Sequence, residues 1–229
     1  VPTIEEVIAA GAAESAETVG VVVATYTRGA LINDGTGYML IYNGSALDAV
    51  AGDEVHVAGK TSMYGGMLQF AQGSTVTVLS TGNEVVHPEP AVLDGAGMDA
   101  ILTATSVQYI EYTGTLGVSG YYYNVTIDGA ATAIGSLQYI DAAAHPAAVD
   151  GAAIKVRGYY IGVSSGKYVN TMTVSVEAVT AEADPWAGEN VVSYDLPESA
   201  SSSRQVLRNI KYYADAENGE DRENDRHEG

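Results

Sequence analysis

Tyrosine is the residue type in this sequence with the clearest capacity for recognition chemistry. The chain has 16 tyrosines but one tryptophan and one phenylalanine. A tyrosine offers a broad ring for stacking and a hydroxyl for hydrogen bonding, and it loses little rotamer freedom on binding. Alternation along a strand would send Tyr121 and Tyr123 to one side and Tyr122 to the other. The alternative is that inward-facing tyrosines fill a core almost without other aromatic residues.

A serine-nucleophile pattern is present but lacks the elements it requires. The run Gly162-Val163-Ser164-Ser165-Gly166 matches G-x-S-x-G, which needs a strand before the serine and a helix after it. The residues that follow, 168–176, predict a strand, so we expect a hairpin turn instead. The same turn accounts for the S-x-x-K match of Ser164 and Lys167. We therefore assign no catalytic residue and expect a protein that is not an enzyme.

Histidines and aspartates do not form a metal-binding pattern. No two histidines are four residues apart, and two of them precede proline, which favours extended or turn backbone (His56, His87, His145, His227). Four aspartates adjoin glycines at turns, where their side chains bond nearby backbone (Asp34, Asp53, Asp94, Asp128). None has the spacing of a calcium loop, although a weak calcium site stays an alternative. We predict no metal and no cofactor, and the lack of cysteine removes disulfides, Cys-based zinc sites and thiol catalysis.

The charge is strongly negative and unevenly spread. Lys and Arg number 10 against 29 Asp and Glu, a net charge of −19. Residues 1–180 hold 17 acids and five bases, a net of −12, and residues 181–229 carry the other −7. Phosphate contacts need clustered Lys and Arg, so a nucleic-acid partner is not expected. No apolar run reaches 18 residues, and we expect membrane association only through a lipid anchor attached upstream of Val1.

Short alternating segments predict β-structure throughout residues 18–79. Strands are expected at 18–24, 30–33, 38–42, 54–59 and 67–79, with a hairpin turn at Asp34-Gly35-Thr36-Gly37. Residues 45–50 are rich in alanine and predict a short helix. At the N-terminus, Ile4, Val7 and Ile8 share a helical face, with Thr3 and Glu6 placed as a capping box.

The second half repeats this plan. The segment Ala51–Gly59 aligns with Asp150–Gly158 at an offset of 99 residues, and both read turn, glycine, then alternating β-branched positions. A period of that size indicates a duplicated domain rather than a solenoid. We expect a first barrel with its helix at 1–83, a proline-containing linker at 84–98, a second barrel at 99–180 and an acidic extension at 181–229.

The strand pattern resembles tandem OB-fold domains of the nucleic-acid type. Three runs of the first half, Gly20–Tyr26, Leu31–Tyr42 and Gly52–Gly59, look like the strands of such domains, which the progression V-x-G-x-V, DGTG-x-h-x-V-Y and GD-x-V-x-V-x-G marks, where h is hydrophobic. Pairs of this kind resemble those in secreted or surface lipoproteins of gut Bacteroidetes. The resemblance implies an all-β chain of two five-stranded Greek-key barrels with a short N-terminal helix.

The resemblance also implies where a ligand would bind. OB-folds place ligands on strands two and three with flanking loops. The tyrosines expected there, and therefore our predicted ligand-binding residues, are Tyr26, Tyr38, Tyr42, Tyr64, Tyr121, Tyr123, Tyr159 and Tyr168. We expect a non-catalytic, extracytoplasmic binding module for a protein or glycan, at the cell surface or in the periplasm and associated with the outer membrane. The alternative is a single-stranded nucleic-acid-binding module that serves a secreted nuclease or phosphatase system.

The acidic extension has one feature of interest. Val206, Leu207, Ile210 and Tyr213 have helical spacing, and Ser201 to Ser203 could cap the helix. We expect a short helix here, in a tail that is either frayed or docks on a partner.

Overall fold

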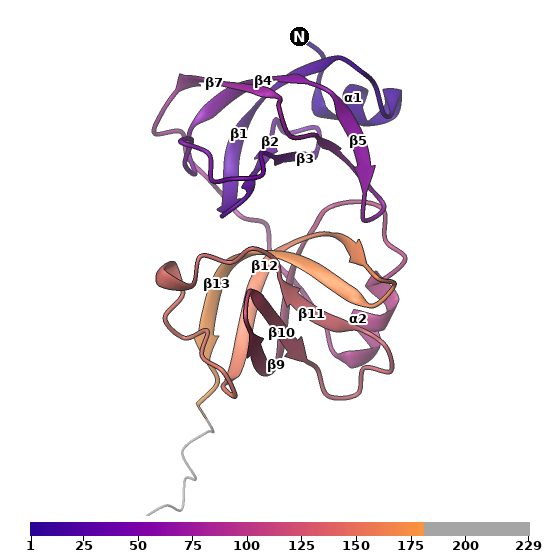
Figure 1. Cartoon of the computed structure of the whole chain (residues 1–229), viewed down its shortest axis with the longest axis vertical. Coiled ribbons are helices and arrows are strands. Elements are labelled where there is room, and N and C mark those ends of the chain that lie inside the picture. The colour runs from indigo at the N-terminus through magenta and orange to yellow at the C-terminus, as the bar shows by residue number, and fades with distance from the viewer. Residues whose placement is uncertain (181–229) are drawn as a thin grey trace, which may run out of the picture. The chain divides into compact units, whose positions relative to one another are not determined.

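The structure, a computed structural model, describes residues 1–180 (Figure 1). It begins with helix α1 (Ile4–Ala10), and the predicted capping box is confirmed. The Thr3 hydroxyl accepts from the Glu6 amide at 3.2 Å, and the Glu6 carboxylate accepts from the Thr3 amide at 2.9 Å. The helix is fixed to the first sheet by Asp34, whose carboxylate accepts from the Ile4 amide at 2.8 Å. The predicted C-terminal helix lies outside the described residues.

The first half forms a seven-stranded sheet in the order β5-β6-β3-β2-β1-β4-β7. Its strands are β1 (Ala16–Tyr26), β2 (Gly29–Asn33), β3 (Tyr38–Tyr42), β4 (Glu54–Gly59), β5 (Thr61–Tyr64), β6 (Met67–Phe70) and β7 (Thr75–Ser80). β2 and β3 pair antiparallel across the Asp34–Gly37 turn, as the sequence predicts. All neighbours are antiparallel except β3 and β6, which are parallel.

The second half closes into a barrel. Its sheet contains β8 (Ala91–Val92), β9 (Gln108–Ser119), β10 (Tyr122–Thr126), β11 (Ile134–Leu137), β12 (Ala153–Ser164) and β13 (Tyr168–Ala178). The order is β10-β11-β13-β12-β9-β8, and β10 also pairs with β9, which joins five strands in a ring. The pair β11–β13 is parallel, so the barrel is mixed. Helix α2 (Gly95–Ile101) begins within the predicted linker, and β8 lies inside it.

The prediction of two closed barrels is wrong for the first half, whose sheet is open. Its last strands are each broken in two, β4 from β5 at Lys60 and β6 from β7 at residues 71–74. The second break includes Gly73 in the left-handed region, at φ 94°. The corresponding strands β12 and β13 run through 12 and 11 residues and complete the ring. The helix predicted at 45–50 is also absent from the described residues, which form bends there.

Each sheet encloses its own core. Ile4, Val22, Ile32, Ile41 and Phe70 belong to the first. Ile110, Tyr112, Val125, Ile154 and Tyr160 belong to the second. The aromatic residues of this second core are tyrosines rather than phenylalanines, and their buried hydroxyls form hydrogen bonds. Tyr112 meets Thr171 Oγ1 at 2.9 Å, and Tyr160 donates to the Ala104 carbonyl at 2.7 Å.

Candidate functional site

A third apolar cluster joins the two halves, and we call it the seam. Its buried members come from β1–β3 on one side and from β12 and β13 on the other: Val23, Ala24, Tyr26, Leu31, Leu40, Tyr159, Ile161 and Met172. Backbone bonds support it, since the Val163 amide donates to the Gly65 carbonyl at 2.9 Å. Residues 1–179 form one compact unit. Side chains from both halves therefore meet at the seam and can build a common site.

Tyrosines gather at one margin of the seam around Tyr139, which precedes the short 3₁₀ turn η1 (Ala142–Ala144). The Tyr26 ring meets it edge-on at 5.6 Å between centroids, and the Tyr42 ring lies 6.5 Å away. The Arg28 guanidinium stands 5.4 Å from the Tyr139 centroid, within cation–π range. Burial raises the pKa of Tyr139 from its usual value, and the neighbouring Tyr42 raises it further, so the hydroxyl stays protonated.

A second aromatic group surrounds His87, which lies on the segment that connects the halves. The imidazole stacks on Tyr109 at 5.1 Å, and its Nδ1 lies 2.8 Å from the Tyr159 hydroxyl. Tyr159 in turn contacts the Tyr38 ring at 5.2 Å. His87 thus ties the connecting segment to the second half, where Tyr159 also contacts Tyr38 of the first half. Burial lowers the pKa of His87 below 6.5, which favours the neutral imidazole.

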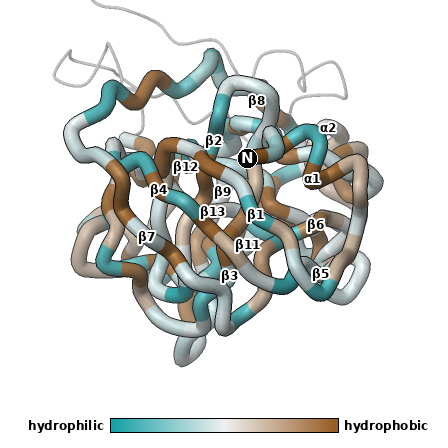
Figure 2. The backbone as a smooth tube through the Cα atoms, turned by 90° about the horizontal axis from the view of Figure 1, so that it is seen from above, coloured by the Kyte–Doolittle hydropathy of each residue, from teal (hydrophilic) through white to brown (hydrophobic). Residues whose placement is uncertain are grey.

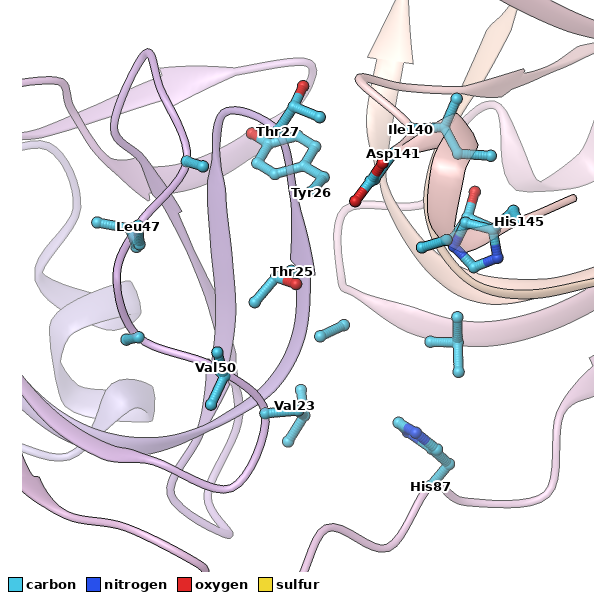
Figure 3. A pocket seen from close by; sticks show the side chains of 17 residues that line it. Val23, Thr25, Tyr26, Thr27, Leu47, Val50, His87, Ile140, Asp141 and His145 are labelled. Carbon is cyan, nitrogen blue, oxygen red and sulfur yellow. The ribbon is translucent and has the colours of Figure 1, made fainter.

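A cavity of about 380 Å³ opens beside the seam, between β1, the segment before β4 and the turn at η1 (Figure 3). Figure 3 shows Val23, Thr25 and Tyr26 on one wall and Asp141 and His145 on the opposite one. The lining residues are Val23, Ala24, Thr25, Tyr26, Thr27, Ala46, Leu47, Ala49, Val50, Ala51, His87, Ile140, Asp141, Ala144, His145, Thr173 and Val174. Both halves and the connecting segment contribute to it.

The polar groups of the cavity are mostly uncharged. Burial lowers the pKa of His145 as it does that of His87, with the nearby Asp141 carboxylate opposing the shift. Thr25 and Thr27 are exposed hydroxyl side chains. Thr173 is buried, and its Oγ1 has no hydrogen-bond partner within the described part of the chain. Asp141 is the one acidic side chain among the residues that line the cavity, and these include no lysine or arginine.

Five of the eight predicted ligand-binding tyrosines belong to the seam or its margins. Tyr26 and Tyr159 are buried in it, and Tyr38 and Tyr42 pack against it. Tyr64 is half exposed, and its hydroxyl lies 3.5 Å from Ser164 Oγ across the seam. Tyr26 also lines the cavity directly.

The other three predicted tyrosines lie elsewhere. Tyr121 is 95% exposed at the turn between β9 and β10. Tyr123 packs against the core of the closed barrel. Tyr168 begins β13, with the Lys167 ammonium 5.1 Å from its ring centroid. The face predicted for the second half is therefore divided, because Tyr159 lies in the seam and these three tyrosines lie outside it.

The sequence reasoning missed several cavity residues. Asp141 and His145 come from one connection, which also carries Tyr139 at the margin of the seam, and His87 comes from another, 58 residues before His145 in the chain. Both histidines precede proline, which predicts irregular backbone at each of them. The sequence does not indicate that these two segments line the same cavity.

Asp34 and Asp53 accept backbone hydrogen bonds at turns as predicted, and residues 162–166 contain the β12–β13 turn. Asp94 accepts one as the N-cap of helix α2 rather than in a turn, and Asp128 lies in a turn with no side-chain hydrogen bond within the described residues.

Two further observations bound the chemistry of residues 1–180. No group of three or more His, Asp or Glu side chains in this part of the chain is placed to hold a metal ion. Within the same residues, no helix has the length and apolar character to cross a membrane.

Comparisons with protein families and with curated proteins found no match for this chain.

Proposed function

We propose that this protein is a non-catalytic binding module that holds a neutral glycan unit in the cavity beside the seam. The observation that carries the proposal is the cavity itself, which is large enough for a sugar unit and is built jointly by both halves and their connection. Small-ligand sites in proteins are concave and mostly apolar, with a few convergent polar groups. This cavity has that composition.

The polar groups match the hydroxyls of a sugar. Each sugar hydroxyl both donates and accepts, and a neutral imidazole likewise has one donor and one acceptor nitrogen. His145 supplies such a ring, His87 has its Nε2 left because its Nδ1 already meets the Tyr159 hydroxyl, and Asp141 adds acceptor oxygens. The apolar wall of Val23, Leu47 and other aliphatic residues suits the C–H faces of a sugar ring.

Charge favours a neutral ligand over an anionic one. Asp141 lines the cavity, and residues 1–180 carry a net charge of −12. A polyanion would meet repulsion at long range and would find no cation on the cavity wall. This weighs against the single-stranded nucleic-acid alternative. A protein ligand would need a broader contact surface than a concave site of this size offers.

The strand order supports assigning the OB-fold to the halves. In the closed barrel, the ring β9-β10-β11-β13-β12 with parallel β11 and β13 follows the five-stranded Greek-key plan. The first half has the same antiparallel β1-β2-β3 meander, a parallel pairing of β3 with β6, and β4 beside β1. We therefore propose a tandem OB pair, acting as an extracytoplasmic module on a bacterial surface as the sequence resemblance implies.

A cavity-filling substitution tests this function. Ala46 lines the cavity and is exposed, so Ala46→Phe should occupy the space with little effect on folding. We expect an array of neutral glycans to identify a ligand of the wild type, and calorimetry to show that Ala46→Phe lowers its affinity at least tenfold.

The matched control is Ala46→Ser, which changes the same position without filling the cavity. It should bind as the wild type does. Undiminished glycan binding by Ala46→Phe would show that the cavity is not the site. Hydrolysis of the bound glycan would show that the module is an enzyme.

A further inference from the structure

Four tyrosines beside the cavity form a group that we call the aromatic margin: Tyr26, Tyr42, Tyr64 and Tyr139. The Tyr26 and Tyr42 rings lie 5.6 and 6.5 Å from the Tyr139 ring between centroids. Burial raises the pKa of Tyr139, and the nearby hydroxyls of Tyr42 and Tyr64 raise it further. Tyr139 is 37% exposed and Tyr64 is 50% exposed. Helix α1 lies at the end of the first half that is remote from the second half, so it leaves these rings uncovered (Figures 1 and 2).

Tyr139 has a backbone conformation that residues with side chains rarely adopt. Its φ is 46°, in the left-handed region, and Ser165 is the only other non-glycine residue with a positive φ in residues 1–180. The Tyr139 carbonyl accepts from the Thr27 amide at 2.9 Å, which holds the strained segment in place. Strained residues of this kind gather at binding and catalytic sites. Because glycine would adopt the same backbone without strain, the tyrosine points to a use for its ring.

A guanidinium fixes the orientation of this ring. Arg28 lies in the turn between β1 and β2, where its Nη1 donates to the Gly44 carbonyl and its Cζ stands 5.4 Å from the Tyr139 centroid. Three of the five bases in residues 1–180 form ion pairs with carboxylates, but Arg28 has no such partner within this part of the chain. The other N–H groups of its guanidinium are therefore left to donate to oxygen atoms of a ligand.

The aromatic margin and the cavity are parts of one surface. Tyr26 belongs to both, and Ile140 and Asp141, which follow Tyr139 directly in the chain, line the cavity. Thr27, whose amide donates to the Tyr139 carbonyl, is a further lining residue. Figure 3 shows Tyr26 and Thr27 opposite Asp141. A ligand that fills the cavity and extends past the Tyr26 ring would therefore reach the Tyr139 ring.

We propose that the aromatic margin is a second subsite, which stacks the next neutral sugar unit of a glycan whose first unit occupies the cavity. The inference rests on the proposed function and extends it, because the ligand becomes an oligosaccharide of two or more units. The face of an aromatic ring is negative and attracts the slightly positive C–H groups of a sugar ring. The tyrosine hydroxyls and the Arg28 guanidinium can form hydrogen bonds with the hydroxyls of the same unit.

NMR titrations of the full chain test the subsite with sugars of two lengths. The probes are glucose, galactose, mannose and N-acetylglucosamine, each as the monosaccharide and as the disaccharide of two such units. We expect a monosaccharide to bind weakly in the cavity and its disaccharide to bind about tenfold more tightly, because the second unit adds a stacking contact. Tyr139→Gly keeps the left-handed backbone but removes the ring, so it should abolish this gain and leave the affinity for the monosaccharide unchanged.

Tyr139→Phe keeps the ring and should retain most of the gain. Tyr121→Gly is the matched control, since Tyr121 is an exposed tyrosine at the β9–β10 turn, outside the margin. It should bind both sugars as the wild type does, and circular dichroism should show that all variants are folded. Monosaccharide binding with no gain for the disaccharide, or a gain that survives Tyr139→Gly, would overturn the subsite and leave the cavity as a binding site. Failure of every probe to bind would overturn the proposed function together with the subsite.

Discussion

Individual tyrosines serve different purposes in this protein, although the sequence presents them as one class. Tyr112 is 1% exposed and fills the core of the closed barrel, whereas Tyr121 is 95% exposed on a hairpin turn. Spacing along a strand fixes which tyrosines share a face, but it does not state whether that face meets a core, a seam or solvent. For this reason the sequence could select Tyr26 and Tyr42 without revealing that their rings meet Tyr139.

The two cavity histidines give a prediction for pH. Burial holds the pKa of His87 and His145 below 6.5, their usual value in an unfolded chain. The unfolded state therefore binds more protons as the pH falls through this range, and acidification should lower the free energy of unfolding. Their contribution is fully present above about pH 6.5 and is lost as the pH falls through the folded-state pKa values.

Urea denaturation at neutral pH and at about pH 5 measures this effect. The double variant His87→Gln/His145→Gln should lose less stability on acidification than the wild type does. An equal or greater loss in the variant would show that these histidines do not account for the pH dependence.

At the scale of elements, the closed barrel depends on a close approach between strands β9 and β11. A Cβ built on Gly135 of β11 would lie 2.7 Å from the Tyr112 ring, which β9 projects into the core. The ring is buried and its hydroxyl is bonded to Thr171, so it has little freedom to move. Glycine is therefore required at position 135 because a side chain would collide with Tyr112, and not because of the backbone conformation.

Gly135→Ala should accordingly destabilise the protein by about 1–3 kcal/mol through overpacking. Gly117→Ala is the matched control, because Gly117 is also a strand glycine of this barrel and its added Cβ would approach no closer than 3.8 Å to the Asn124 carbonyl. We expect it to change stability by no more than about 0.5 kcal/mol. Chemical denaturation of both variants measures the difference. Equal stabilities would contradict the packing argument.

The positions of most strands could be predicted from the sequence, but the breaks within them could not. Alternation and the Asp34–Gly37 turn located β1–β4, and the 99-residue repeat located β12. The predicted strand at 67–79 nevertheless divides at residues 71–74, and the short strand β11 was not specified. Local patterns locate strands, but whether a sheet closes depends on pairings between distant segments, which a single sequence does not show.

At the scale of the unit formed by residues 1–179, the central claim is that two halves and their connection create one site. The cavity is built from unlike parts of the two halves. It combines β1 of the first half with η1 and β13 of the second, and with His87 between them. Neither half alone contains the full set of lining residues. A ligand bound there would therefore contact both halves at once.

The most direct test of this claim is an NMR titration of the ¹⁵N-labelled protein with the neutral glycan selected by the array. The account predicts that the largest amide shift changes occur together at Thr25 of β1 and Thr27 directly after it, and at Asp141 and His145 near η1, on both sides of the cavity. Shift changes confined to one half, such as the exposed Tyr121–Tyr122 turn, would contradict it.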